Sequence, residues 1–382
     1  MKSTYFSYTS STFHKATVVA TIIFIISCFP LISKAQYSFT TDKMISCTEV
    51  KNQQKTNTCW SYATTSFIES ELLRVGKGKY DLSEMFVVKN IFKEKAYNYV
   101  MRQGKANFAQ GGLSHDVIRA INKYGFIPEN QFSGLSATET IHDHSELERG
   151  LKSYLDGILK RNPLSQHWQQ AVDNILDAYL GISPTQFEVN NETYTPKSFF
   201  KDLGLSAEDY ISITSFTHSA FYEKFILELP DNFSNGMYYN IPLEELVEVI
   251  DYALISGYSI SWDGDVSESS FDGQKGIAVL PVDTEMDCFS SPVDEIIVTQ
   301  NNRQAAFESH RTTDDHLMHI VGLSLDQNGT KYYVLKNSWG KNNPYQGYIY
   351  MSESYLKMKT ISITMHKEGL PEKASRKLLS SN

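Results

Sequence analysis

The order in which apolar patterns follow one another constrains the fold of this chain most. Up to about residue 254, apolar residues recur mainly at the spacing of amphipathic helices; after Gly257 the pattern changes to short apolar or alternating runs typical of strands. Helices that precede strands, instead of alternating with them, favour an α+β fold. We therefore predict a helical part followed by an antiparallel sheet or barrel.

The clearest predicted helix starts at Cys59 and stops at the glycines Gly76 and Gly78. Other helices are expected after Asp81 or Ser83, over 114–124, in two pieces over 143–181, and from Pro242 to about 254. The expected strands are 258–262, 277–282, 320–325, 332–335 and 348–351.

Composition indicates a globular protein without nucleic-acid partners. The chain has 382 residues, 41% of them hydrophobic, which is enough for one large core or two ordinary ones. Its formal net charge of -9 is spread along the sequence without a basic stripe. Such a charge does not attract a phosphate backbone.

Residues 1–35 have the pattern of a signal peptide. An apolar run from Ala16 to about Ile32 follows Lys2, and Ala35 fits the cleavage-site rule, so a mature start near Gln36 is expected. This predicts an exported protein, periplasmic or secreted, without stable membrane association after processing. Two alternatives stay open, a lipoprotein acylated at Cys28 and an uncleaved anchor.

An odd number of cysteines would remain after export. Cys47, Cys59 and Cys288 cannot all pair within one chain, so at least one thiol is a candidate for reactivity. Cys47 and Cys288 could form a disulfide or stay as two buried thiols, and the sequence does not decide between these.

Cys59 is the candidate nucleophile because it opens a helix, where free backbone N–H groups and the helix dipole favour a thiolate. Gln53, six residues earlier, could donate its side-chain amide to a developing oxyanion together with the Cys59 backbone N–H. The simpler alternative is that Cys59 is a small buried hydrophobic residue and Gln53 a solvated loop residue.

His319 is the predicted base, oriented by Asn337, with Trp339 shielding their hydrogen bond from water. The segment 326–330 predicts a hairpin turn between the two. A three-residue loop, 327–329 with Gly329 left-handed, would set 319 opposite 337, whereas a two-residue turn would put Asn337 on the other face. Contact between His319 and Asn337 therefore requires a loop with an odd number of residues, or a bulge in the hairpin.

At this point the chain resembles the papain-like cysteine peptidases, in particular the bleomycin hydrolase and aminopeptidase C branch. The similarity covers most of 45–130 and 245–370. The motifs that carry it are Gln53 to Ala63, Leu82-Ser83-Glu84, Gly111-Gly112, Tyr124 to Glu129, Asp314 to His319, and Lys336 to Gly340.

The resemblance implies a two-lobed fold with the active site in the cleft, Cys59 on the helical lobe and His319 and Asn337 on the β-rich lobe. It also implies that Gly111 and Gly112 bind an extended peptide, with Trp339 a further substrate-binding residue. The expected parts are a helical lobe to about 130, a helical insertion over about 131–240, a β-rich lobe over about 241–366, and a tail over 367–382. In this branch the C-terminus typically lies in the cleft and restricts cleavage to N-terminal residues; the length of the tail here puts that restriction in doubt.

We therefore predict a thiol peptidase, an aminopeptidase before an endopeptidase, acting on peptides without a cofactor and able to form a homo-oligomer. The alternatives are a transglutaminase-like acyltransferase and a catalytically silent papain-fold binding protein. A metal site built from His310, His316, His319 and the adjacent aspartates has no supporting spacing. The segment 262–265 resembles the branch too, but a strand end and turn explains it.

Overall fold

The chain was analysed as a computed structural model that describes residues 37–135 and 139–379. The predicted signal peptide, with Cys28, lies outside the described residues. None of the helices in the described part has the length and apolar character needed to cross a membrane.

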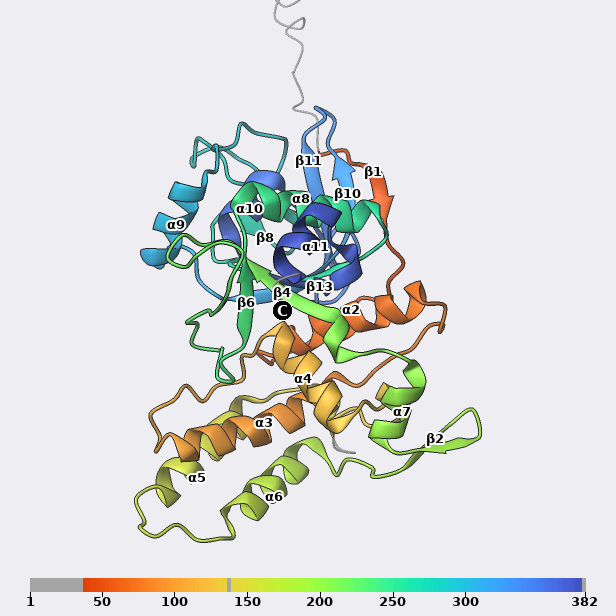
Figure 1. Ribbon diagram of the computed structural model, residues 1–382, viewed down its shortest axis with the longest axis vertical. Coiled ribbons are helices and arrows are strands. Elements are labelled where there is room, and N and C mark those ends of the chain that lie inside the picture. Colours follow the sequence, from red (N-terminus) through yellow and green to blue (C-terminus); the bar gives the residue numbers. More distant parts are fainter. Residues whose placement is uncertain (1–36, 136–138, 380–382) are drawn as a thin grey trace, which may run out of the picture. The chain divides into compact units, whose positions relative to one another are not determined.

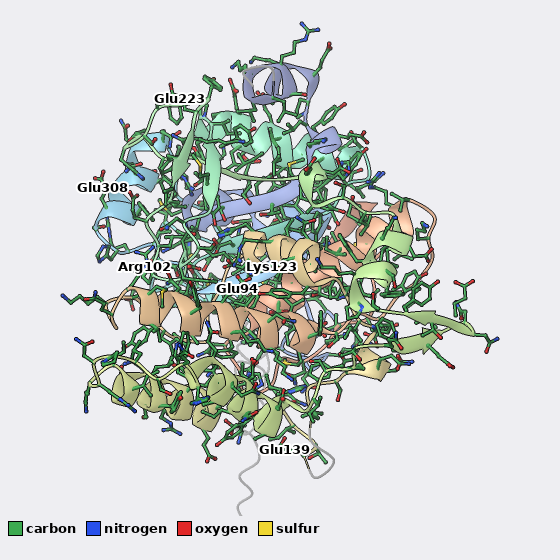
Figure 2. All side chains as sticks on the ribbon, turned by 60° about the horizontal axis from the view of Figure 1, so that its bottom comes forward. Glu94, Arg102, Lys123, Glu139, Glu223 and Glu308 are labelled. Carbon is green, nitrogen blue, oxygen red and sulfur yellow. The ribbon has the colours of Figure 1, made fainter. Side chains whose placement is uncertain are left out.

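The helical part is built around one hydrophobic core. α2 and α4 lie between the sheet and a further layer of helices, α3, α5 and α6 (Figure 1). Glu94 on α3 accepts hydrogen bonds from Lys123 and Tyr124 at the end of α4 (2.9 and 2.8 Å), and Figure 2 shows Glu94 next to Lys123. The helices are α2 (Cys59–Arg74), α3 (Glu84–Met101), α4 (Ser114–Tyr124), α5 (Ser145–Ile158), α6 (Trp168–Leu180) and α7 (Pro196–Leu203).

The second part is a large sheet with its own core. Its strand order is β5-β6-β4-β13-β7-β10-β11-β12-β9-β8, and β1 pairs with the far end of β10. The strands are β1 (Thr40–Met44), β4 (Tyr210–Thr214), β5 (Lys224–Ile226), β6 (Met237–Asn240), β7 (Ile260–Gly264), β8 (Phe271–Asp272), β9 (Ile277–Ala278), β10 (His316–Leu325), β11 (Lys331–Lys336), β12 (Tyr348–Ser352) and β13 (Thr360–His366).

Shorter elements complete the chain. The helices of the second part are α8 (Leu243–Ile255), α9 (Gln300–Glu308), α10 (Glu353–Lys359) and α11 (Glu372–Leu379). A separate hairpin joins β2 (Phe187–Val189) to β3 (Glu192–Tyr194), and the 3-10 turns are η1 (Glu129–Gln131), η2 (Ala207–Asp209) and η3 (Lys367–Gly369).

The α+β class and the helices α2, α4 and α8 are as predicted, but the insertion over 131–240 is not purely helical. Its last part, 210–240, supplies β4, β5 and β6 to the main sheet, with β4 paired to β13. The sheet is not purely antiparallel either, because β4 pairs parallel to β6 and β12 parallel to β9. These strands are two to five residues long, too short for their own pattern to stand out.

Helix α2 is buried on nearly all sides, and this fixes the position of Cys59. It packs against α3 and α4 on one side and against β7 and β10 on the other. Every residue from Cys59 to Leu72 is buried, including Glu69 and Glu71. A helix held in this way cannot shift without disturbing both cores, so its first turn is a rigid support for a reactive side chain.

Candidate active site

Cys59 is the first residue of α2 and is 8% exposed. Two effects compete at this thiol. The helix N-terminus favours the thiolate, whereas burial disfavours it and raises the pKa of Cys59 to about 12, despite a hydrogen bond with the Leu317 backbone. Burial is the larger effect, so the resting group is a thiol and needs a base to become a nucleophile.

The thiol lines a cavity of about 570 Å³. Five of the residues predicted for the site line this cavity. They are Gln53, Cys59, Gly111, Gly112 and Trp339. The histidine that lines this cavity is His316, and His319 is not among the lining residues.

His316 is the histidine that Asn337 orients. Its Nε2 lies 2.8 Å from Asn337 Oδ1, and both side chains are buried. Since the amide oxygen only accepts, Nε2 carries the hydrogen and Nδ1 keeps the lone pair that a general base needs. Asn337 Oδ1 also accepts from the backbone N–H of Ser338 (2.7 Å). The Trp339 ring covers His316 at 4.6 Å between ring centroids, which places it as predicted for a shield, but over a different histidine.

The predicted pairing of His319 with Asn337 is therefore wrong, although the predicted turn is present. Gly329 has φ of +82°, and the Asp326 N–H donates to the Thr330 carbonyl, as in a three-residue loop. Next to the loop, residues 322–325 of β10 pair with β11 in a register that, if continued, would set 319 opposite 337. A bulge between Ile320 and Gly322 then shifts the register by one residue, so that His319 faces Lys336. A shift of one residue moves every later side chain to the opposite face.

Beyond the bulge, Asn337 shares its face with residues 316 and 318, and His316 can reach it. His319 points into the protein instead, where it is 0% exposed and its Nδ1 lies 2.9 Å from Ser66 Oγ. Burial, and then the charge of Lys336, lower the pKa of His319 well below its ordinary value. It is a neutral buried histidine that packs on Phe67 and has no access to the thiol.

Gly322 is the signal that could have revealed the bulge. A single glycine inside a strand pattern marks a bulge or a close backbone approach, and here both occur. A Cβ at position 322 would lie 2.5 Å from the carbonyl oxygen of Lys43 on β1, which pairs with this end of β10. Counting one extra residue at Gly322 would have exchanged the faces of His316 and His319.

Gln53 is held beside the thiol by Ser338, in the irregular segment that follows β11. Its Oε1 accepts from Ser338 Oγ (2.7 Å), its backbone N–H donates to the Ser338 carbonyl (2.8 Å), and its Nε2 donates to the Thr56 carbonyl (2.6 Å). One Nε2 hydrogen therefore stays available on a fixed amide. This geometry suits a donor aimed at negative charge that develops near Cys59.

Gly111 and Gly112 belong to a loop whose carbonyls accept hydrogen bonds from two buried side chains. Trp60 Nε1 donates to the Gln110 carbonyl (2.9 Å), and the ammonium group of the buried Lys95 donates to the carbonyls of Ala109 (3.0 Å) and Gly111. A Cβ on Gly112 would lie 2.9 Å from the Trp60 ring, so no side chain fits there without a shift. The absence of side chains leaves the backbone open to the cavity, as expected for peptide binding.

The sequence is similar to a known protein family over most of its length. Residues 17–381 match the Peptidase C1-like family. The chain belongs to this family. The sequence is 23% identical to aminopeptidase C of Streptococcus thermophilus over 84% of this chain and 81% of that protein. It is 20% identical to aminopeptidase W of Lactobacillus delbrueckii subsp. lactis over 84% and 82%.

The crystal structure of PepW from Lactobacillus rhamnosis HN001 superposes with a TM-score of 0.71, at 19% identity over 96% of this chain and 92% of that one. These findings confirm the papain-like fold and the predicted resemblance to the aminopeptidase C branch. This Peptidase C1-like protein is a cysteine peptidase.

The sequence does not decide whether Cys47 and Cys288 pair or whether the C-terminal tail lies in the cleft. Cys47, Cys59 and Cys288 are all free thiols, and Cys47 Sγ lies 3.3 Å from the hydroxyl of Tyr348. Residues 367–379 of the tail form η3 and α11, which pack on α8, and none of them lines the cavity.

In the described ranges, no three His, Cys, Asp or Glu side chains come together as a metal-binding group.

The surroundings of His316 predict the acid limit of activity. Burial lowers the pKa of His316 to about 4, although the hydrogen bond with Asn337 acts in the opposite direction. A general base must be neutral, so kcat/KM should stay level as the pH falls through 6.5 and drop only with a midpoint near pH 4. The measurement is kcat/KM from pH 3 to 8, with circular dichroism at each pH to exclude unfolding. An acid limb centred near pH 6.5 in folded protein would contradict this assignment.

Proposed function

We propose that this protein is a thiol aminopeptidase that hydrolyses peptide bonds through Cys59, His316 and Asn337. The observation that carries the proposal is the hydrogen bond between His316 and Asn337 at the edge of the cavity that holds Cys59. The names of the aminopeptidase relatives support removal of N-terminal residues.

The first half of the reaction forms an acyl-enzyme. His316 Nδ1 takes the Cys59 proton while Sγ attacks the peptide carbonyl carbon. The oxyanion accepts hydrogen bonds from Gln53 Nε2 and from the backbone N–H of Cys59. The imidazolium, held in place by Asn337, then returns the proton to the leaving amine as the carbon–nitrogen bond breaks.

The second half releases the product. His316, neutral again, removes a proton from a water molecule that attacks the thioester, and the proton goes to Cys59 Sγ as the carbon–sulfur bond breaks. Burial of His316 beneath Trp339 excludes bulk water from its hydrogen bond with Asn337, which keeps the tautomer and orientation fixed throughout the cycle.

The test is hydrolysis of fluorogenic peptides with free and with blocked N-termini by reduced protein starting at Gln36, beside Cys59→Ala. Cleavage that requires a free amine and disappears in Cys59→Ala would establish the aminopeptidase. Cleavage of blocked peptides with equal efficiency would make the protein an endopeptidase of the same fold. Folded, reduced protein without turnover that depends on Cys59 would leave only a binding function.

A further inference from the structure

The cavity wall beside Cys59 is acidic, and this inference rests on the proposed function and deepens it. The lining residues include Asp231, Asp314 and Asp315, and no lysine or arginine of the described chain is among them. The buried Lys95, which is 2% exposed, donates from its ammonium group to the carbonyls of Ala109 and Gly111 and is attracted to Asp231 and Asp314. Lys95 does not line the cavity, so a ligand in the cavity meets the carboxyls and not the ammonium group.

Asp231 lies directly on the glycine loop. A Cβ built on Gly111 would be 1.8 Å from Asp231 Oδ2, and its three nearest atoms all belong to the Asp231 carboxyl. The carboxyl therefore fills the space beside Gly111 that a side chain would occupy, where a peptide bound along this loop would meet it. A substrate that ends at this point meets a carboxylate, and a longer one meets an obstruction.

The loop that carries Asp231 is fixed by hydrogen bonds. Asn107 Nδ2 donates to Asp231 Oδ1 (2.9 Å) and to the Pro230 carbonyl (3.2 Å). Asn232 joins the two sides of this loop, with Nδ2 donating to the Leu227 carbonyl (2.8 Å) and Oδ1 accepting from Gly236 N–H (2.7 Å). Asp231 is therefore presented in one position and is not a mobile surface group.

A further carboxyl, that of Asp263, lies behind the wall next to Asp314. Asp263 is 1% exposed, and apart from the carboxyl of Asp314 its Oδ1 has no partner in the described part of the chain. Its Oδ2 accepts from Ser362 Oγ (3.0 Å). Burial, and then the neighbouring Asp263, raise the pKa of Asp314 well above its ordinary value. Carboxyls grouped in this way keep their protons, and a positive charge brought close to them would favour the ionised form.

We propose that Asp231 is a specificity-determining residue that binds a cationic nitrogen of the peptide substrate, in the first place its free N-terminal ammonium group. The carboxylate both attracts that group and blocks the path beyond it, so a single side chain selects the N-terminus. A lysine or arginine side chain offers the same chemistry, and the experiment separates the two sources.

The test compares wild-type protein with Asp231→Asn on alanyl and acetyl-alanyl coumarin amides. Hydrogen bonds to charged groups are stronger than neutral ones, so kcat/KM for the free amine should fall roughly 10- to 100-fold, mainly through KM. The value for the acetylated substrate should stay level or rise. Equal changes on both substrates, or no change on either, would overturn the proposal.

A second pair of substrates identifies the source of the nitrogen. Acetyl-lysyl-alanyl and acetyl-norleucyl-alanyl coumarin amides both lack a free N-terminus. If Asp231→Asn weakens only the lysyl substrate and leaves the alanyl amide unchanged, Asp231 binds basic side chains and its assignment to the N-terminus is overturned. Asp283→Asn, an exposed carboxylate outside the cavity, is the matched control for the change in net charge.

Binding to the Cys59→Ala protein separates this inference from the proposed function. Calorimetric titration with trialanine and acetyl-trialanine needs no turnover, and the free-amine peptide should bind more tightly by roughly the same factor. Adding Asp231→Asn should abolish that preference. A preference that persists in the double variant rejects Asp231 even if the protein is an aminopeptidase, and its loss supports Asp231 even if catalysis is never detected.

Discussion

Replacing His316 by alanine is expected to lower kcat/KM by roughly three to six powers of ten, because the Cys59 thiol loses the one histidine among the described residues that line the cavity. His319→Gln should keep kcat/KM within about tenfold of wild type, since His319 touches Ser66 and Phe67 and not the cavity. The contrast between two histidines three residues apart makes this a test of the bulge as well as of the base. The measurement is kcat/KM on the best fluorogenic substrate, corrected for active sites titrated with a thiol reagent.

Stability is the necessary control, because His319 is part of a buried polar network. Ser66 Oγ also accepts from Lys336 Nζ (2.8 Å), so His319→Gln changes a core contact and should lower the melting temperature. His316→Ala removes a buried imidazole that is hydrogen-bonded to Asn337 and should lower the melting temperature as well, so both variants are assayed at a temperature where they are folded. If folded His319→Gln lost activity as completely as His316→Ala, the assignment of the base would be wrong.

The sequence sufficed for most of the site because its signals are local. Each of these signals can be recognised without knowing how the elements pack. They are a cysteine that opens a helix, a glutamine six residues earlier, a glycine pair and an Asn-Ser-Trp-Gly segment. The choice between His316 and His319 is different, because it depends on the number of residues between two paired strands. The three-residue loop is present as predicted, but the bulge before Gly322 shifts the register by one more residue, so His319 and Asn337 lie on opposite faces again.

The same contrast applies to the fold, where helices are predictable from local sequence and the pairing of distant strands is not. Helices α4 and α8 carry their own apolar period and end at glycines or caps, which a short window contains. Strand β13 follows α10 without a loop residue between Lys359 and Thr360, so no turn signal announces it. Its partner β4 lies about 150 residues earlier, and pairing across such a distance leaves no trace in either segment.

The same distance between partners hides the role of Asp265 in the sequence. The segment 262–265 predicts a strand end and a turn, and β7 does end at Gly264. Yet Asp265 is 0% exposed, and its carboxylate joins three segments. Oδ1 accepts from Ser267 N–H and Oγ (2.7 Å each), and Oδ2 accepts from the backbone N–H of Thr313 (3.0 Å) and lies 3.3 Å from Lys359 Nζ.

Asp265→Ala is therefore expected to lower the free energy of unfolding by about 3 kcal/mol, because it leaves the buried Lys359 ammonium without one of its two carboxylates. The loss sits at the lower end of the range for breaking a buried ion pair because Glu268 still contacts Lys359. Asp265→Asn keeps a single acceptor oxygen, which can serve Ser267 or Thr313 but not both, so it should recover only part of the loss. Chemical denaturation measures both, with Asp283→Ala as the exposed control.

A functional readout distinguishes this network from a purely structural one. Thr313 begins the short loop that ends at His316, so loss of its hydrogen bond to Asp265 should loosen the base as well as the fold. At a temperature where Asp265→Ala is fully folded, kcat should fall more than KM changes, because the position of His316 matters for proton transfer and less for substrate binding. Adding Lys359→Met should recover part of the stability by removing the uncompensated charge, but not the activity. Full recovery of both would mean that Asp265 serves only to neutralise Lys359 and does not hold the loop before His316.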